Sequence, residues 1–447
     1  MEYTPLKKKN RNRRNKSKLK GKNRENKEDG NFKLKIIFKT IFIFIFILYD
    51  IIIILHLVKT FFVLFDENKA FQEILSFEKN INFSEDIFYE FLEINEQNKL
   101  FEENIKFEKF ESPDISVVML IYNQAHCLHR CLRSIQNQSL KNIEIIIVDD
   151  CSLDNSVELI KEYQKEDPRI ILIEHDANEG MIKTRTDGVR IAKGKYITSI
   201  DGDDTFIHKD ILKNSVYIAE KGNLDIVEFS KYIFYGGRFK QKSYEFPELN
   251  LSYIIKQPEL RTKFIWIDKF NNYHLINEQI IGKLIKNKLY KKAMKYVGKR
   301  YTEDYINRAE DRIFIVSFFH LANSYYLMKE IGYLYYKGKK VKYSPNEKTK
   351  KCKVIYKIKD FDHFKFTKFL VENTGNNLKE QMVAYNQITS LNFFYQINNK
   401  KMEKRHFKIM LKILDKSSTF EFLSQEKKEY IMKIKNKILE IKRDKQY

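Results

Sequence analysis

The pattern of hydrophobic positions changes at Pro113. From there, short continuous apolar runs alternate with segments in which apolar residues recur every three or four positions. Continuous apolar runs are typical of parallel strands buried on both faces, and their alternation with helical segments predicts a doubly wound α/β sheet. We expect strands at 115–121, 143–148, 170–174 and 195–200, and helices at 125–137, 154–164 and 181–192.

Polar clusters follow three of these strands: Tyr122-Asn123, Asp149-Asp150 and the stretch Ser-Ile-Asp-Gly-Asp-Asp at 199–204. In such sheets ligands bind at the carboxyl ends of the strands, so these clusters should meet in one crevice. Crowded carboxylates raise one another's pKa, and a bound Mg²⁺ or Mn²⁺ would relieve that repulsion. Gly202 allows the chain to turn tightly there. A solvated acidic turn is the alternative interpretation.

The chain contains neither the Gly-x-Gly-x-x-Gly fingerprint of dinucleotide-binding folds after its first strand nor a Gly-x-x-x-x-Gly-Lys-Ser/Thr phosphate loop. Those glycine-rich loops hold phosphates with backbone N–H groups. If this crevice holds a diphosphate, we therefore expect it to do so through a divalent cation on the aspartates.

Residues 40–58 read TIFIFIFILYDIIIILHLV, which is close to the length that crosses a bilayer. Asp50 costs roughly 3 kcal/mol at mid-membrane, whereas each Ile, Leu, Phe or Val returns roughly 0.3–0.6 kcal/mol, so insertion should survive it. We therefore predict a transmembrane anchor within 36–65. The alternative is a buried or aggregating strand, because the run is also β-prone.

Residues 1–35 carry 14 Lys and Arg against 4 Asp and Glu. Basic flanks stay in the cytosol, so we expect a single-pass type II membrane protein with a basic cytosolic tail at 1–35. Residues 66–112 are acidic, with scattered Phe and Leu, and predict a helical stem. This orientation would place the rest of the chain across the membrane, and we expect it in the Golgi or endoplasmic reticulum.

The formal net charge is +22, but it is unevenly placed. Residues 341–447 hold 25 Lys and Arg against 12 Asp and Glu, so subtracting +10 and +13 leaves about −1 for 36–340. A nucleic-acid enzyme would surround its active centre with positive charge, so we expect no nucleic-acid partner. We expect a basic helical C-terminal region at 341–447, either packed on the core or in contact with an anionic membrane or acceptor.

The four cysteines are too few for a disulfide scaffold. The stretch His126-Cys127-Leu-His129-Arg-Cys131 has some zinc-ligand character, but no second ligand pair follows at finger spacing. We interpret it as an ordinary helix that packs two small sulfurs.

Four segments together resemble the inverting family-2 glycosyltransferases with a GT-A fold. They are ISVVMLIYN (115–123), VDDCSLDNS (148–156), ANEGMIKTRTDGVRIAKGKYI (177–197) and SIDGDD (199–204), in family order and spacing. The resemblance continues to residue 340. It implies a GT-A glycosyltransferase domain at 113–340, a Rossmann-like, mostly parallel sheet flanked by helices.

The resemblance also implies roles for the nucleotide end of the site. Tyr122 looks like the residue that packs on the nucleotide base, and Asp150 like the acceptor for the base's ring N–H. Arg185 looks like the family arginine near the ribose and diphosphate. Asp201 and Asp203 look like the metal motif, with Asp203 the direct ligand of Mn²⁺ or Mg²⁺.

The catalytic end is implied by the sequence Ala-Glu-Asp at 309–311. Asp311 looks like the catalytic base, with Glu310 beside it in the motif. Inversion needs one base to take the proton of an acceptor hydroxyl as that oxygen attacks the anomeric carbon. From the bare sequence, Asp311 could equally be a helix N-terminal carboxylate that favours the dipole.

These features predict a metal-dependent inverting enzyme that moves a sugar from a nucleotide-sugar donor, expected to be a UDP-sugar, to a hydroxyl of a glycan, glycoprotein or glycolipid. No Gln-x-x-Arg-Trp motif occurs, so we expect non-processive transfer. Two alternatives remain: an enzyme like the dolichyl-phosphate sugar synthases, and a non-catalytic membrane tether with the GT-A fold.

Overall fold

The structure is a computed structural model, and it divides into two units, residues 1–70 and 71–447, which we describe separately. It describes residues 51–54, 69, 72–74, 76–77, 107–235, 238–241, 254–260, 265–267, 273–275, 279–304, 306, 310–337, 361–373, 404–417 and 425–444.

In the first unit, residues 51–54 are helical with exposed side chains. Among the described residues, no helix is both long enough and apolar enough to cross a bilayer. The predicted tail at 1–35 and most of the predicted anchor at 36–65 lie outside the described residues, so both remain predictions.

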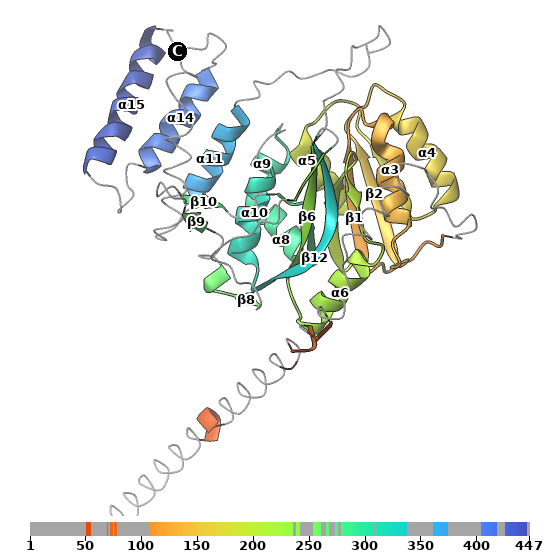
Figure 1. Cartoon of the computed structure of the whole chain (residues 1–447). Coiled ribbons are helices and arrows are strands. Elements are labelled where there is room, and N and C mark those ends of the chain that lie inside the picture. Colours follow the sequence, from red (N-terminus) through yellow and green to blue (C-terminus); the bar gives the residue numbers. More distant parts are fainter. Residues whose placement is uncertain are drawn as a thin grey trace, which may run out of the picture. The chain divides into compact units, whose positions relative to one another are not determined.

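The second unit begins its α/β domain with four parallel strands, in the spatial order β3-β2-β1-β4. Figure 1 shows β1 and β2 side by side, with α3 and α4 next to them. The helices that connect them return each strand to the same edge, which is why the strands run parallel. This half confirms the predicted alternation to within two residues at each boundary. The elements are β1 (Ile115–Ile121), α3 (Ala125–Gln136), β2 (Ile143–Asp149), α4 (Ser156–Glu166), β3 (Ile170–Glu174), α5 (Met181–Ile191) and β4 (Tyr196–Asp201).

The expectation of a mostly parallel sheet holds only for this first half, because the sheet continues as β4-β11-β6-β12-β5 with mixed directions. Strand β11 runs antiparallel to both β4 and β6, whereas β12 runs parallel to β6. The further strands are β5 (Thr205–Phe206), β6 (Ile226–Tyr235), β7 (Arg238–Gln241), β8 (Ile255–Lys256), β11 (Lys283–Lys286) and β12 (Ser324–Lys337), with a separate pair of β9 (Ile265–Ile267) and β10 (Tyr273–Leu275).

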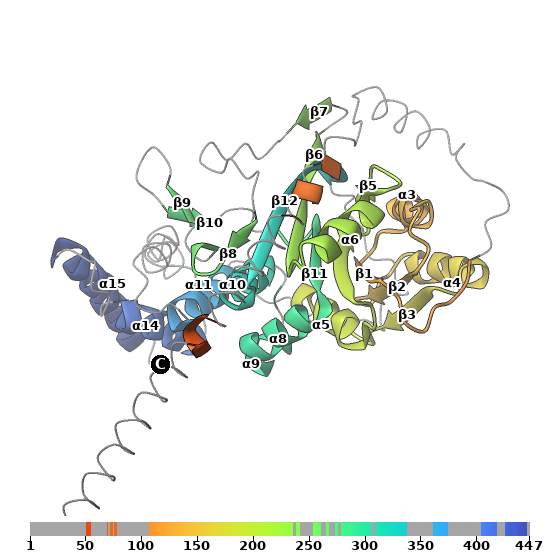
Figure 2. The same cartoon turned by 90° about the horizontal axis from the view of Figure 1, so that it is seen from below.

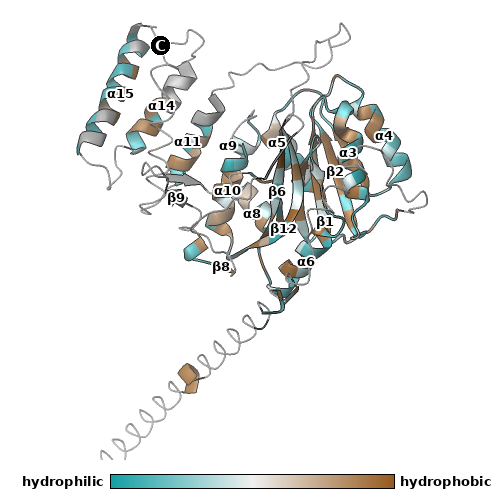
Figure 3. Cartoon of the chain, viewed as in Figure 1, coloured by the Kyte–Doolittle hydropathy of each residue, from teal (hydrophilic) through white to brown (hydrophobic). Residues whose placement is uncertain are grey.

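The side chains of alternate residues in the central strands belong to two hydrophobic cores, one on each face of the sheet. Helices lie on both sides of the sheet (Figure 2). Val117 and Met119 of β1 pack towards α3, α4 and α6 (Ile211–Lys221), whereas Val118 and Leu120 pack towards α5, α8 (Asn287–Val297) and α10 (Glu310–Leu321). Because both faces are covered, the central strands carry apolar side chains on both sides. Figure 3, coloured by hydropathy, shows β1 and β2 as largely hydrophobic.

The C-terminal helices are α11 (Phe361–Asn373), α14 (Lys404–Ser417) and α15 (Gln425–Asp444), preceded in the domain by the short α9 (Lys299–Thr302). Phe369 of α11, Ile413 of α14 and Ile434 of α15 belong to the same buried cluster as Phe318 of α10. The predicted basic helical region is therefore helical where it is described, and it packs on the α10 side of the domain.

Part of the predicted stem also contacts the domain. Ile74 is fully buried, the Phe77 ring lies 4.4 Å from the Tyr217 ring between centroids, and Lys221 Nζ lies 2.7 Å from Glu73 Oε2. These residues pack against α6, so this stretch is not a free-standing spacer.

Candidate active site

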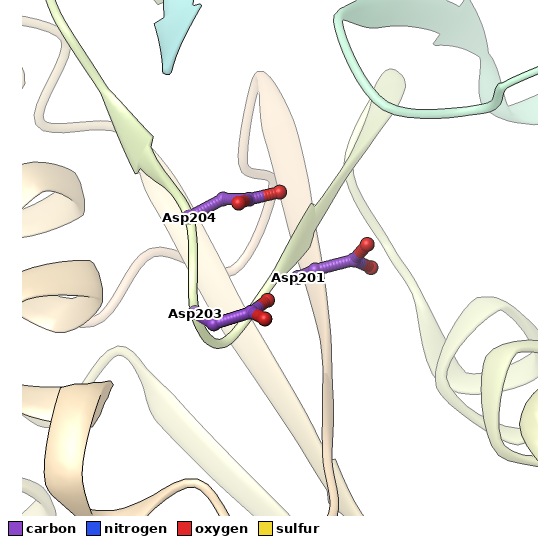
Figure 4. Close-up of side chains that lie close together, drawn as sticks. All are labelled: Asp201, Asp203 and Asp204. Atoms are coloured by element: carbon purple, nitrogen blue, oxygen red, sulfur yellow. The ribbon is translucent and has the colours of Figure 1, made fainter. Parts of the chain in front are cut away.

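Three carboxylates gather where β4 ends. Asp201 is the last residue of β4, and Asp203 and Asp204 lie in the turn that leads to β5. Each offers a carboxylate oxygen within 4.8 Å of the others, and Figure 4 shows the three side chains extending from the turn to the same side. The three aspartates therefore form one cluster at the end of β4, and their convergence with the polar residues after β1 and β2 remains a prediction.

Gly202, between the first two aspartates, lies directly against the side chains of Ile121 and Gln124. A Cβ at Gly202 would lie 2.3 Å from Ile121 Cδ1 and 2.4 Å from Gln124 Oε1. Because glycine has no side chain, the acidic turn (residues 201–204) can pack closely against these two side chains.

Asp204 is the structural member of the cluster. It is fully buried; the Tyr333 hydroxyl donates to Oδ2 at 2.7 Å and the Tyr336 N–H donates to Oδ1 at 2.8 Å. Burial and the carboxylates of Asp201 and Asp203 raise the pKa of Asp204 well above its usual range. Both of its oxygens already serve β12.

Asp201 has the character of a metal ligand. Burial, reinforced by the Asp311 and Asp203 carboxylates and opposed by Arg185, raises the pKa of Asp201 to about 7. Its Oδ1 atom is buried and has no hydrogen-bond partner among the described residues. An unsatisfied carboxylate oxygen beside two more carboxylates suits a hard divalent cation such as Mg²⁺ or Mn²⁺, so the residues present fit the predicted metal.

The Asp203 turn is held from the side by α3. Arg130 Nη2 donates to the Asp203 carbonyl oxygen at 2.6 Å, and the guanidinium carbon lies 3.6 Å from the centre of the Tyr336 ring. The Tyr336 N–H also donates a hydrogen bond to Asp204, so residues of both α3 and β12 hold the acidic turn in place.

Arg185 joins the metal end of the crevice to α10. Its side chain is buried, and Nη2 donates to Glu310 Oε1 at 3.4 Å and to Asp311 Oδ1 at 3.2 Å. Although burial opposes the charged form, Asp311, Glu310 and Asp201 together keep the pKa of Arg185 above its usual value. Nε and Nη1 of Arg185 have no hydrogen-bond partner among the described residues.

The two acidic residues at the start of α10 differ in environment. The Glu310 side chain is 4% exposed, and burial together with Asp311 raises its pKa well above its usual range, whereas Arg185 lowers it. The Asp311 side chain is 24% exposed. The Glu310 side chain is thus enclosed by the protein, and Asp311 is the more accessible of the two carboxylates.

The predicted nucleotide end lies at the ends of β1 and β2. Tyr122 is 38% exposed, as a platform for a base would be, and the Asp150 N–H donates to the Ile121 carbonyl at 2.9 Å beside it. Asn123 adopts a left-handed conformation with φ of 55°, and its Oδ1 accepts the Leu153 N–H at 2.6 Å, which ties the two strand-end loops together.

The Asp150 carboxylate already forms several hydrogen bonds within the protein. Its Oδ1 accepts the Glu179 N–H at 2.7 Å and lies 3.0 Å from His175 Nδ1, and its Oδ2 accepts the Gly180 N–H at 3.0 Å. It therefore organises the loop before α5. Its predicted contact with a nucleotide base remains a prediction.

Cys127 and Cys131, considered above as zinc ligands, are buried on α3 against the core. Burial raises the pKa of Cys127 to about 12, so its thiol stays protonated. Within the described residues, the metal-ligand cluster is the aspartate group alone.

The structure adds three residues that the sequence did not single out. Arg130 and Tyr333 form hydrogen bonds to the acidic turn. Lys231 of β6 is a buried cation near that turn. Their pattern gives no signal, because an arginine on an amphipathic helix or a tyrosine in a long strand is usually a packing residue.

Comparison with known proteins gives the site a context. Residues 116–292 match the family model described as "Glycosyl transferase family 2". The chain is 30% identical over 231 residues to an uncharacterised glycosyltransferase, EpsJ, of Bacillus subtilis, covering 50% of this chain and 61% of EpsJ. It is 29% identical over 224 residues to a poly(ribitol-phosphate) beta-glucosyltransferase of Bacillus spizizenii, covering 49% of this chain and 32% of that protein.

Among solved structures, TarS 1–349 of S. aureus in complex with UDP-GlcNAc aligns with a TM-score of 0.50 at 17% identity, covering 75% of this chain and 93% of the TarS chain. That likeness concerns the fold, which is GT-A-like. The chain spans less than two thirds of the length of the two Bacillus relatives. On the family match and the glycosyltransferase relatives together, the chain carries a glycosyltransferase family 2 domain.

Proposed function

We propose that the protein is a metal-dependent inverting glycosyltransferase that moves a sugar from a UDP-sugar to a hydroxyl of a glycan, glycoprotein or glycolipid. The observation that carries this proposal is the Arg185 guanidinium, which hydrogen-bonds Glu310 and Asp311 and also acts electrostatically on Asp201. This contact supports the proposal because it links the acidic pair at the start of α10 to the aspartate cluster after β4.

In this mechanism, Asp201 and Asp203 would hold Mn²⁺ or Mg²⁺, while Asp204 keeps the turn in shape. When bound, the cation supplies positive charge that stabilises the leaving nucleoside diphosphate. Tyr122 packs on the base, and Arg185 holds α10 so that Asp311 faces the reaction centre. Asp311 accepts the proton of the acceptor hydroxyl as its oxygen bonds to the anomeric carbon and the bond from that carbon to the diphosphate oxygen breaks.

UDP is proposed as the donor's nucleotide because the TarS structure that shares this fold contains UDP-GlcNAc. Nucleotide binding measures the donor's base directly. The full chain in detergent should be stabilised thermally by one nucleoside diphosphate among UDP, GDP, CDP and ADP, and only when Mn²⁺ is present. Stabilisation follows from ligand binding to the folded state.

The matched variants are Asp203→Ala, which should lose the shift, and Asp304→Ala, which should keep it, because Asp304 pairs with Lys365 on α11. If no diphosphate stabilises the wild-type protein, the enzyme proposal fails and the tether alternative gains support. Release of UDP from a UDP-sugar, followed with Mn²⁺ and with EDTA, then tests the transfer chemistry.

We also propose the predicted single-pass anchor at 36–65, with the domain in the Golgi or endoplasmic reticulum. The support is the apolar run and the basic residues before it. In sealed microsomes, protection of the domain from added protease would agree with this orientation. Digestion would place the site in the cytosol and favour an enzyme like the dolichyl-phosphate sugar synthases.

A further inference from the structure

Lys231 is a buried cation at the edge of the sheet where β4 ends. Leu284 of β11 pairs with Thr198 of β4 on one side and with Val227 of β6 on the other. Strands β4 and β6 both run antiparallel to β11, so they run in the same direction as each other. Asp201 follows Thr198 in β4, and Lys231 follows Val227 in β6, so both residues lie towards the same edge of the sheet. The residue is 4% exposed and pairs in register with Tyr333, whose hydroxyl binds Asp204.

A chain of polar contacts leads from the domain interior to Lys231. The Tyr325 hydroxyl donates to Glu228 Oε2 at 2.9 Å, and Lys283 Nζ lies 3.1 Å from the same oxygen. Lys283 Nζ also donates to the Gln279 carbonyl at 2.6 Å, and Lys231 Nζ donates to Gln279 Oε1. Glu228 and Lys283 therefore form an interior ion pair, and Lys231 continues the network towards the crevice.

The charges around Lys231 belong to the candidate active site. Burial and the neighbouring Lys283 lower the pKa of Lys231 to about 8, whereas Glu228, Asp311 and Asp204 act in the opposite direction. Lys231 in turn stabilises the charged form of Asp201. Its ammonium is therefore within electrostatic reach of both the aspartate cluster and the acidic pair on α10.

A diphosphate brought to this crevice meets several carboxylates, so it needs more positive charge than a divalent cation alone provides. The positive charge of Arg185 is already opposed by the carboxylates of Glu310 and Asp311, which its Nη2 atom hydrogen-bonds. We propose that Lys231 binds a β-phosphate oxygen of the donor's nucleoside diphosphate and stabilises the charge that develops there on leaving. This inference rests on the proposed function and adds a substrate-binding residue to it.

The test compares nucleotides that differ by the β-phosphate. Binding of UDP and of UMP, each with Mn²⁺, is measured by calorimetry on the full-length wild-type protein and on Lys231→Met, which keeps the length of the side chain but removes its charge. We expect UDP affinity to fall about tenfold and UMP affinity to fall less than twofold. GDP and GMP form the parallel pair.

Lys286→Met is the matched control, because Lys286 lies at the other end of β11, paired with Asp225 at 3.2 Å, and should leave both affinities unchanged. Lys231→Arg keeps the charge and should retain most of the difference between UDP and UMP, which covers the case in which the methionine variant does not fold.

Equal weakening of UDP and UMP, or no change in either, would assign Lys231 to the interior network and overturn the inference. If only the KM for the acceptor rises, the lysine serves the acceptor, and the inference is equally wrong. A wild-type protein that binds neither nucleotide would instead remove the proposed function itself.

Discussion

The hydroxyl of Tyr333 donates to Asp204 Oδ2 at 2.7 Å and accepts the Asp201 N–H at 3.2 Å. One side chain from β12, in the second half of the domain, thus fixes both ends of the acidic turn that follows β4. The acidic turn is therefore held by a residue that is more than 120 positions away in the sequence.

Replacing Tyr333 with Phe removes both of these hydrogen bonds without changing the ring. A buried acceptor left unsatisfied costs about 1–3 kcal/mol, so we expect the free energy of unfolding to fall by that amount in denaturant titrations. Mn²⁺ affinity, measured by electron paramagnetic resonance, should fall as well. Tyr163→Phe is the control, since its hydroxyl contacts His129 on the surface of α3, and unchanged Mn²⁺ binding in both variants would contradict the prediction.

Arg130 should act on metal affinity through the backbone of Asp203. We expect Arg130→Met to weaken Mn²⁺ binding about tenfold, because a hydrogen bond from a charged donor is worth about 1.5–3 kcal/mol and its loss frees the turn. Arg130→Lys should recover part of the affinity.

Arg133→Met is the matched control for that experiment. Arg133 lies on the same helix, but its guanidinium stacks on Tyr163 at 5.1 Å. The same Mn²⁺ affinity in the two methionine variants would mean that the turn keeps its shape without the contact from α3.

Asp311→Asn tests the proposed base. The variant keeps the shape of the side chain but cannot accept the proton, so kcat should fall about 10²–10⁴-fold while UDP binding is retained. Steady-state transfer and UDP calorimetry measure the two quantities. Asp304→Asn is the same substitution at a site that pairs with Lys365 at 2.6 Å, and it should leave kcat unchanged. Full turnover by the Asp311 variant would leave the carboxylate a purely structural role.

His175 should make stability depend on pH. Burial disfavours its charged form, but the nearby carboxylates of Asp150 and Asp187 outweigh this and raise the pKa of His175 from 6.5 to about 9. Because the folded-state pKa lies above the unfolded one, the stabilisation is complete below about pH 6.5 and is lost as the pH rises through about 9. At about 1.4 kcal/mol per pKa unit, the loss is up to about 3 kcal/mol.

Denaturant titrations between pH 6 and pH 9.5 measure this loss. In His175→Gln the slope across that window should be shallower than in the wild type. His129→Gln serves as control, because His129 contacts the Tyr163 hydroxyl rather than a carboxylate. Parallel curves for the wild type and the His175 variant would show that the imidazole is not charged in the folded protein.

The sequence was most informative where local pattern decides the structure. The run from Ile115 to Ile121 is apolar on both faces because helices cover both faces of the sheet, and its strand lies where the pattern placed it. The aspartates at 201–204 converge because they follow a strand end. The antiparallel β11 was not predicted, because a four-residue strand carries too little periodicity to reveal its direction.

Residues that act through long-range contacts were also outside the reach of sequence patterns. Lys231 reads as one lysine in a strand, and only the register with Tyr333 places it at the crevice. The contact between Arg185 and Asp311 joins positions 126 residues apart, and the family resemblance rather than spacing brought those two together.

Both carboxylate oxygens of Asp204 accept hydrogen bonds from residues of β12, and this affects how a cation and a nucleotide would bind. With Asp204 bonded to β12, the described part of the chain offers Asp201 and Asp203 as carboxylate ligands, whereas Mg²⁺ and Mn²⁺ favour about six oxygens. We expect water and phosphate oxygens to supply further positions. The cation and the diphosphate should therefore bind with positive cooperativity, and by linkage each should raise the affinity of the other by the same factor. On this view, the species that the protein recognises is the metal–nucleotide complex rather than either component alone.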